Sequence, residues 1–216
     1  MAVVETVAPG RYLAEFTVAA QGMWQMLNRW LPERFSTEMV YRQGRLAPLV
    51  YREEFVNHGQ HVVREYRFDY ESHHLTLWRQ ADDRAKVKKW QVPLNGPVYD
   101  LLSLLYNVRL GVLGPLLGGA TLRVSVLSDK PHNMEFRIGP ETPLGRKVML
   151  DFRLPESDRV DSYFIYLNPD QVPTLAWTRV TLLGKLAGRL LNPGGIKKAL
   201  LPEVASFSAP AVLGTR

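Results

Sequence analysis

Apolar and polar residues alternate with a period of two along most of this chain, and that alternation predicts β-strands with one buried face. The clearest example is a long strand in which Val62, Arg64, Tyr66, Phe68 and Tyr70 share one side. Turn-forming Gly, Asn, Asp and Pro residues separate the strands. The strands that this pattern predicts cover residues 12–18, 35–41, 46–55, 62–70, 75–79, 87–94, 120–127, 133–138, 146–154, 162–167 and 174–183.

One segment departs from the alternation and predicts a short helix over residues 98–108. Pro97 suits a first helical position, because its missing N–H would have no partner there, and Gly111 follows the end. The residues that recur at helical spacing and form an apolar stripe are Val98, Leu101, Leu102, Leu105 and Val108. A single helix among strands predicts a mainly β fold, either a curved antiparallel sheet or an open β-barrel, which the helix plugs or flanks.

Two segments are ambiguous. Residues 22–34 fit a short helix or a strand with an aromatic face, and Pro32 ends either one. The segment after Gly184 fits a helical stripe or a strand or loop packed on the sheet. We favour the strand or loop, because Gly184 and Gly188 each weaken a helix by about 1 kcal/mol relative to alanine.

The length of 216 residues, 46% of them hydrophobic, predicts one globular domain over residues 1–216. We expect its core over about 12–191 and a C-terminal tail over about 192–216. No apolar run reaches the ~20 residues of a membrane span. Residues 1–10 have neither the basic start nor the apolar stretch of a signal peptide, so we expect that an exported form has lost its signal.

Composition narrows the functional classes. The chain has no Cys, which excludes disulfides, thiolate zinc ligands and cysteine nucleophiles. A net charge of +6 favours anionic partners, and peripheral contact with an anionic membrane fits it. The basic residues are spread out, with short runs only at 86–89 and 197–198, so we expect no nucleic acid to bind.

The predicted helix carries four polar residues at a spacing of three, namely Asp100, Ser103, Tyr106 and Arg109. Such a strip could border a cavity, with Arg109 holding a carboxylate or phosphate. The alternative is structural: Asp100 and Arg109 match the helix dipole at the two ends, while Ser103 and Tyr106 bond nearby backbone. We favour the structural interpretation because the charges match the dipole so simply.

The aromatic residues suggest where a ligand would lie. A curved sheet with bulky inward side chains and one helix leaves room for an apolar cavity, as in lipid-binding barrels. The residues that we predict to bind a ligand are Arg109, Tyr106, Ser103, Asp100, Trp24, Trp30 and Trp90. Basic residues at the rim, such as Lys86, Lys88 and Lys89, would meet an anionic head.

Other chemistry has weaker support, and we expect no catalytic residue, metal or cofactor. Ser103 lacks the Gly-x-Ser-x-Gly sequence of a nucleophile elbow. His58 and His61 could meet His73 or His74 across a hairpin, but such imidazoles are more often surface residues than ligands. Neighbouring acidic residues on a strand point to opposite faces and form no acid–base pair.

The order of these features resembles a bacterial family known as domain of unknown function 3108. Its most specific element is the pattern Asp-x-x-Ser-x-x-Tyr-x-x-Arg at residues 100–109, and the likeness extends roughly from Tyr12 to Leu191. The chain departs from it at Met23–Pro32, which is bulkier than the expected glycine-bearing hairpin. The other segments that carry the resemblance are residues 35–37, 44–49, 51–55, 66–70 and 168–173.

Members of that family resemble exported, β-rich envelope proteins of Gram-negative bacteria, and the family brings no activity with it. The resemblance implies a location in the periplasm or at the outer membrane, with a cytoplasmic location left open. We therefore expect a non-enzymatic envelope protein that binds a lipid or another amphipathic small molecule. The alternatives are a module that docks an envelope protein and a hydrolase of cell-wall or lipid substrates.

Overall fold

The computed structural model describes residues 2–17, 34–57, 59–153, 160–180 and 184–189. It is mainly β, with one short helix within the described residues, as the alternation predicts. The ambiguous segment at 22–33, which contains Trp24 and Trp30, lies outside the described residues.

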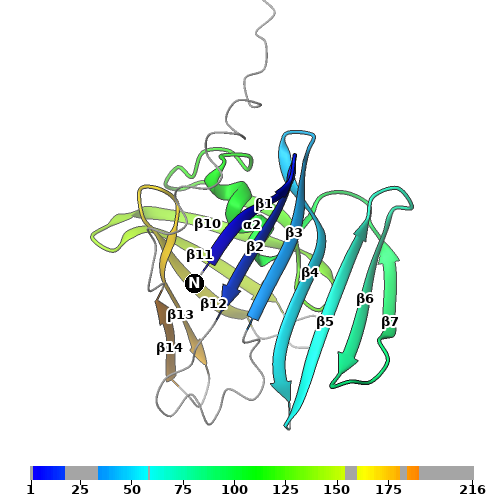
Figure 1. Cartoon of the computed structure of the whole chain (residues 1–216). Helices are drawn as coiled ribbons and strands as arrows, with labels where there is room; N and C mark the ends of the chain where they lie inside the picture. Colours follow the sequence, from blue (N-terminus) through cyan, green and yellow to red (C-terminus); the bar gives the residue numbers. More distant parts are fainter. Residues whose placement is uncertain (1, 18–33, 58, 154–159, 181–183, 190–216) are drawn as a thin grey trace, which may run out of the picture.

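The first seven strands form one antiparallel sheet, sheet A, in which every strand pairs with the next strand along the chain. Figure 1 shows them following one another from the centre of the molecule to its right-hand edge. Their bounds are β1 Ala2–Ala8, β2 Arg11–Thr17, β3 Arg34–Arg42, β4 Arg45–Asn57, β5 Gln60–Asp69, β6 His74–Ala81 and β7 Val87–Pro93.

The remaining strands form a strongly curled second sheet, sheet B, in the order β14 to β8. The helix α2, Leu101–Arg109, lies between β8 and β9 in the chain and sits at the upper end of the molecule between the two sheets (Figure 1). The strands are β8 Val98–Tyr99, β9 Thr121–Leu127, β10 Pro131–Thr142, β11 Gly145–Arg153, β12 Val160–Leu167, β13 Pro173–Val180 and β14 Gly184–Arg189.

The structure corrects the start of the helix, which is Leu101 and not residue 98. Val98 and Tyr99 instead form a short strand that pairs in parallel with β9 and is buried. Asp100 then caps the helix, since its Oδ1 accepts hydrogen bonds from the Leu102 and Ser103 amides. Pro97 therefore precedes a strand.

Both ends of the chain add strands to the sheets. The sequence analysis did not identify β1, which pairs with β2 from Ala2↔Phe16 onwards. Near the other end, β14 pairs with β13, so the favoured strand-or-loop alternative is confirmed as a strand over Gly184–Arg189. The rest of that segment and the expected tail at 192–216 lie outside the described residues.

Asn107 docks the helix on sheet A. It is completely buried, and its Oδ1 accepts a hydrogen bond of 2.9 Å from the amide of Leu46 on β4. Its Nδ2 donates to the Leu46 carbonyl at 2.7 Å and to the Ser103 carbonyl at 2.7 Å. The side chain thus pairs both backbone groups of one strand residue, as a neighbouring strand would.

The inner face of sheet A carries an aromatic ladder that forms part of the core between the sheets. Successive ring centroids lie 5.7 to 6.4 Å apart, a distance typical of favourable aromatic pairs. Val98 and Leu127 of sheet B pack into the same cluster as part of this ladder. The ladder consists of Phe16, Phe35, Tyr51, Tyr66 and Trp90.

On the outer face of sheet A, a buried carboxylate forms ion pairs with three cationic side chains. The Glu65 side chain is 5% exposed and lies within 2.9 Å of Arg52, 2.6 Å of Arg67 and 2.6 Å of Lys86. Burial, the largest single influence, raises the pKa of Glu65. The hydrogen bonds from the three cations together outweigh it and lower the pKa to about 2.

The docking role of Asn107 predicts a large effect of its removal. We expect Asn107→Ala to lower the free energy of unfolding by about 2 to 4 kcal/mol, because it leaves the buried Leu46 amide and carbonyl without partners. Urea unfolding followed by tryptophan fluorescence measures this loss. The control is Asn133→Ala at an exposed position, and equal stability of the two variants would contradict the docking role.

The Glu65 cluster predicts a stability change in acid. Because the folded-state pKa of about 2 lies below the ordinary 4.5, the unfolded chain takes up the proton first as the pH falls. The stabilisation is complete above that ordinary value and is lost as the pH falls toward the folded-state pKa. We expect the difference in urea midpoint between the wild type and Glu65→Gln to shrink over this range. Glu71→Gln, at an exposed position, should show no such trend.

Candidate functional site

The helix presents two different faces to the two sheets. Leu102 and Tyr106 pack with Tyr12 and Met39 in the core on sheet A, next to the Asn107 docking contact. The residues on the other side of the helix line a cavity against sheet B, and they are Leu101, Leu104, Leu105 and Val108. The apolar stripe that the sequence analysis took as one surface is therefore divided between two sides.

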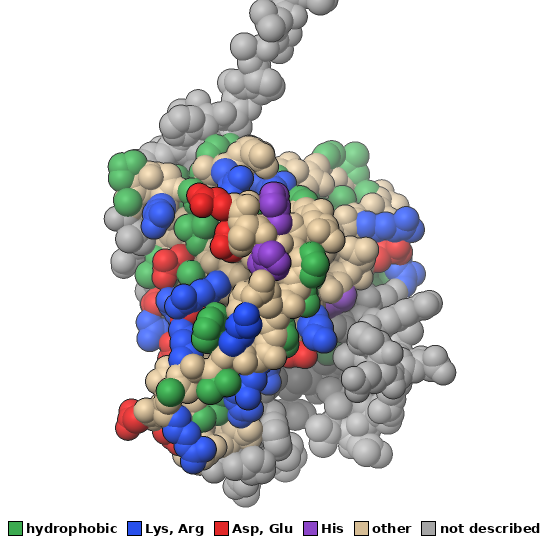
Figure 2. Space-filling model, turned by 90° about the vertical axis from the view of Figure 1, so that its right-hand side faces the viewer, with side chains coloured by type: hydrophobic (Ala, Val, Ile, Leu, Met, Phe, Trp, Pro, Cys, Tyr) green, Lys and Arg blue, Asp and Glu red, His purple; other side chains and the backbone are tan. Residues whose placement is uncertain are grey.

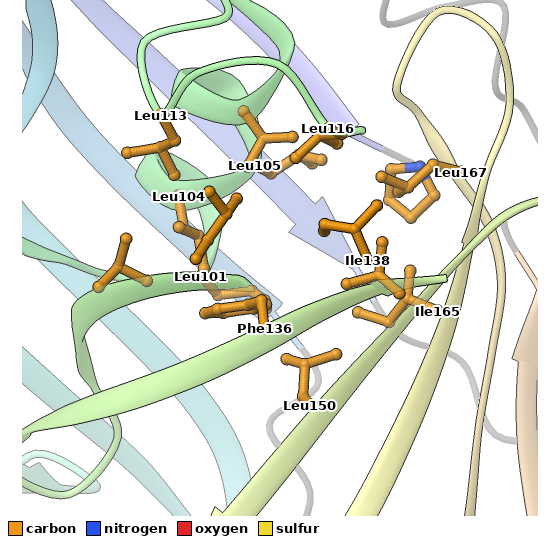
Figure 3. A pocket seen from close by; sticks show the side chains of 15 residues that line it. Leu101, Leu104, Leu105, Leu113, Leu116, Phe136, Ile138, Leu150, Ile165 and Leu167 are labelled. Carbon is orange, nitrogen blue, oxygen red and sulfur yellow. The ribbon is translucent and has the colours of Figure 1, made fainter. Parts of the chain in front are cut away.

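Sheet B supplies the opposite wall through the alternating residues of its strands. Because side chains on a strand point to the two faces in turn, residues two apart reach the cavity together. Figure 3 shows the labelled side chains of the helix and those of the sheet pointing toward one another across an open space. The wall consists of Leu122, Val124, Phe136, Ile138, Val148, Leu150, Ile165, Leu167 and Pro173.

The connector after the helix, residues 111–119, closes one side of the cavity. Leu113 and Leu116 from this segment line it, and Leu116 is buried in a cluster with Ile138 and Val148. The backbone turns with positive φ at Gly114 and Gly119, a conformation that glycine adopts without strain. Arg146 fixes the connector, because its Nη1 donates a hydrogen bond to the Leu116 carbonyl.

The cavity has a volume of about 160 Å³ and every described residue that lines it is Leu, Val, Ile, Phe or Pro. Apolar cavities take up apolar molecules, and an engineered one of similar volume, about 150 Å³, binds benzene. Leu101, at 48% exposure, extends the apolar wall to the surface. The lining offers no group for acid–base or nucleophilic chemistry, so the site is suited to binding.

Asp100 and Ser103 lie on the sheet A side and not at this cavity. Both are buried, and they form a capping box in which the Asp100 amide donates to the Ser103 Oγ at 3.0 Å. Thr37 donates to Asp100 Oδ1 at 2.8 Å, and Asp100 Oδ2 is a buried atom with no hydrogen-bond partner. Burial, the largest influence, raises the pKa of Asp100 despite these hydrogen bonds. The structural interpretation of these two residues therefore has direct support.

Tyr106 and Arg109 also lie outside the cavity lining. The Tyr106 ring is buried with the Arg109 guanidinium 5.7 Å from its centroid. Burial raises the pKa of Tyr106 to about 12 and lowers that of Arg109. Ligand binding by the four residues of the strip stays a prediction, and none of them touches the apolar cavity.

Trp90 belongs to the aromatic ladder and is remote from the cavity lining, with its buried Nε1 lacking a hydrogen-bond partner. Lys86 is engaged by Glu65, and Lys88 donates to Gln91 at 2.8 Å. On the face shown in Figure 2, Lys and Arg side chains are scattered among other groups and form no single basic patch.

Another ionisable group inside the molecule is Glu53, on the inner face of sheet A. Burial, the largest influence, raises the pKa of Glu53. Its carboxylate accepts a hydrogen bond from Tyr51 at 3.2 Å and lies 3.6 Å from Arg64. These contacts partner a buried carboxylate and bring no nucleophile to it.

Within the described residues, no cluster of three or more His, Asp or Glu residues is arranged to hold a metal ion. His61 lies 3.8 Å from Glu54, and His58 is outside the described residues. No helix in the same part of the chain has the length and apolarity to cross a membrane.

The sequence analysis missed the lining of the cavity. The signal was present in two patterns: the side of the helix formed by Leu101, Leu105 and Val108, and the alternation within residues 120–127 and 133–138. These patterns do not identify the element that packs on each face, because periodicity shows only which side of an element is apolar.

Comparison with known proteins gives one match. A family model described as "Protein of unknown function (DUF3108)" matches residues 2–142, from β1 to the end of β10. The matched range includes α2 and ends before the segment 168–173, to which the resemblance in the sequence was also traced. Neither a curated protein nor a solved structure matches the chain.

The capping role of Asp100 predicts different effects of two substitutions. Asp100→Ala removes the cap, and we expect a loss of about 1 to 2 kcal/mol in unfolding free energy that is largest at low pH. Asp100→Asn keeps the acceptor. Since the folded-state pKa of Asp100 is raised, the wild type loses stability as the pH rises through that pKa, and Asp100→Asn does not. Urea unfolding at about pH 4 and about pH 8 separates the two effects. A constant difference between wild type and Asp100→Asn would contradict this assignment.

Proposed function

The chain belongs to the DUF3108 family, and we propose that it binds an amphipathic small molecule whose apolar part enters the cavity between α2 and sheet B. The observation that carries the proposal is the uniformly apolar lining, which continues to the surface at Leu101. Apolar surface that folding leaves accessible gains free energy when a ligand covers it.

The size of the cavity limits the part of the ligand that it holds. A volume of about 160 Å³ suits roughly six carbon atoms, by comparison with benzene in a cavity of about 150 Å³. At about 0.8 kcal/mol for each buried methylene group, such a segment gains on the order of 5 kcal/mol. Part of this gain is lost to the ordering of the ligand, so the apolar segment alone binds weakly and a polar head must add affinity.

The cellular setting that we propose is the periplasm or the outer membrane of a Gram-negative bacterium. Its support is the resemblance of the chain to exported, β-rich envelope proteins. Lipids and lipid-linked molecules are present in the bacterial envelope. The alternative of a protein-docking module has less support, since the edge strand β7 carries exposed Lys88 and Lys89 and ends at Pro93, features that discourage strand addition.

The test is the binding of N-phenyl-1-naphthylamine, a neutral apolar dye, to the purified protein, followed by fluorescence titration. Its phenyl ring has the six carbon atoms that the cavity holds, and its naphthyl group would lie at the mouth beside Leu101. Leu101→Asp places a carboxylate at the mouth of the cavity, and an acidic residue in the first turn of a helix favours the helix dipole. We expect the folded variant to bind the dye roughly tenfold more weakly or worse, because a charge must lose water when the dye enters.

The control is Leu144→Asp, the same substitution at a residue of similar exposure in the turn between β10 and β11. Leu144 does not line the cavity, so its variant should bind the dye as the wild type does. Absence of dye binding by the wild type, or equal weakening by the two substitutions, would exclude the cavity as the binding site.

A further inference from the structure

A second cavity adjoins the apolar one and has polar walls. It measures about 280 Å³ and shares Leu116 and Leu167 with the apolar cavity, so these two side chains stand between the cavities and a ligand that reaches both must pass beside them. Its polar lining comes from two segments, Glu141 and Arg146 on either side of the β10–β11 turn and Asn168 and Gln171 between β12 and β13. The connector at 115–117 adds apolar residues.

Gln171 has a hydrogen-bond acceptor that the fold does not use. The turn around it is complete without its side chain, because Asn168 Oδ1 accepts from the Val172 amide at 2.9 Å and the Asn168 carbonyl accepts from the Gln171 amide at 2.8 Å. The Gln171 Oε1 atom is nonetheless buried at the wall of the second cavity with no hydrogen-bond partner. A buried acceptor left unpaired costs free energy, which a ligand with a donor would recover.

Arg146 is held in a fixed position at the same cavity. Its Nε donates to Glu141 Oε2 at 2.9 Å and its Nη1 donates to the Leu116 carbonyl. The positive charge of Arg146 is therefore already balanced by Glu141, so the described charges of the cavity wall cancel. An anionic ligand would meet the Glu141 carboxylate as well as the guanidinium.

We propose that the second cavity holds an uncharged, hydroxyl-bearing head, such as the glycerol of a monoacylglycerol, whose acyl chain lies in the apolar cavity. A hydroxyl group donates a hydrogen bond to Gln171 Oε1 and accepts one from Arg146. A carboxylate offers no proton to Gln171, and a methyl ester offers none either. This inference rests on the proposed function, because the acyl chain in the apolar cavity positions the head of the ligand in the second cavity.

The experiment compares three competitors that share one acyl chain, namely 1-monooctanoylglycerol, octanoate and methyl octanoate, in displacing N-phenyl-1-naphthylamine from the wild type. We expect 1-monooctanoylglycerol to displace the dye at a concentration about fivefold lower than either of the others, which corresponds to one added hydrogen bond to a buried acceptor. If octanoate displaced the dye at the lowest concentration of the three, the proposal of an uncharged head group would be overturned.

Gln171→Met tests the residue itself, since methionine keeps the length of the side chain and removes the acceptor. Both side chains are unbranched at Cβ, so the left-handed backbone at residue 171, with φ of 59°, imposes a similar cost on each. We expect the variant to bind the dye as the wild type does and to lose the preference for 1-monooctanoylglycerol over methyl octanoate. Gln91→Met, at an exposed position on β7, should keep the preference.

The outcomes separate the two proposals. A wild type that binds no dye, or releases none to any octanoyl compound, overturns the proposed function and with it the head group. Dye binding with normal displacement by all three compounds, but with a preference that Gln171→Met does not change, overturns the assignment of the second cavity alone. Thermal unfolding of each variant shows whether it is folded under the conditions of the assay.

Discussion

The rotation of α2 about its own axis determines the rest of the interior, and buried hydrogen bonds set that rotation. Asn107 holds the backbone of Leu46, and Asp100 accepts from Thr37, so one side of the helix must face sheet A. Hydrogen bonds have stricter geometry than apolar contacts, which would tolerate many rotations. Since these contacts occupy one side, Leu101, Leu105 and Val108 are left facing sheet B.

The two sheets consequently differ in what they contribute. Side-chain contacts join neighbouring strands of sheet A on both of its faces. The aromatic ladder lies on the inner face, and the Glu65 ion cluster lies on the outer face. The inner face of sheet B packs on the aromatic ladder through Val98 and Leu127, and elsewhere it meets the apolar side of a nine-residue helix and the connector that follows it. A helix this short covers less area than a seven-stranded sheet offers, and the cavities form where the cover is incomplete.

Local patterns in the sequence predicted much of this arrangement. The alternation in β5 and the presence of one helix ending near residue 108 followed from local patterns, whereas the predicted start of the helix was wrong. The structural role of Asp100 followed from its place near that start. The division into two sheets could not be predicted, because alternation does not identify pairing partners. The same limit explains Val98 and Tyr99, whose strand depends on β9, more than twenty residues later. Asn107 was missed because its role depends on an unpaired backbone distant in sequence.

The topology has a consequence for the order in which the molecule assembles during synthesis. Each strand of sheet A pairs with strands that are next to it in the chain, so the sheet has a low contact order. Its strand pairing involves no residue after β7. A growing chain could therefore complete sheet A while α2 and sheet B are still within the ribosome. Its aromatic inner face would then stay exposed to water until Val98 and Leu127 emerge and pack on it, and a chaperone that shields apolar surface would be most useful during that interval.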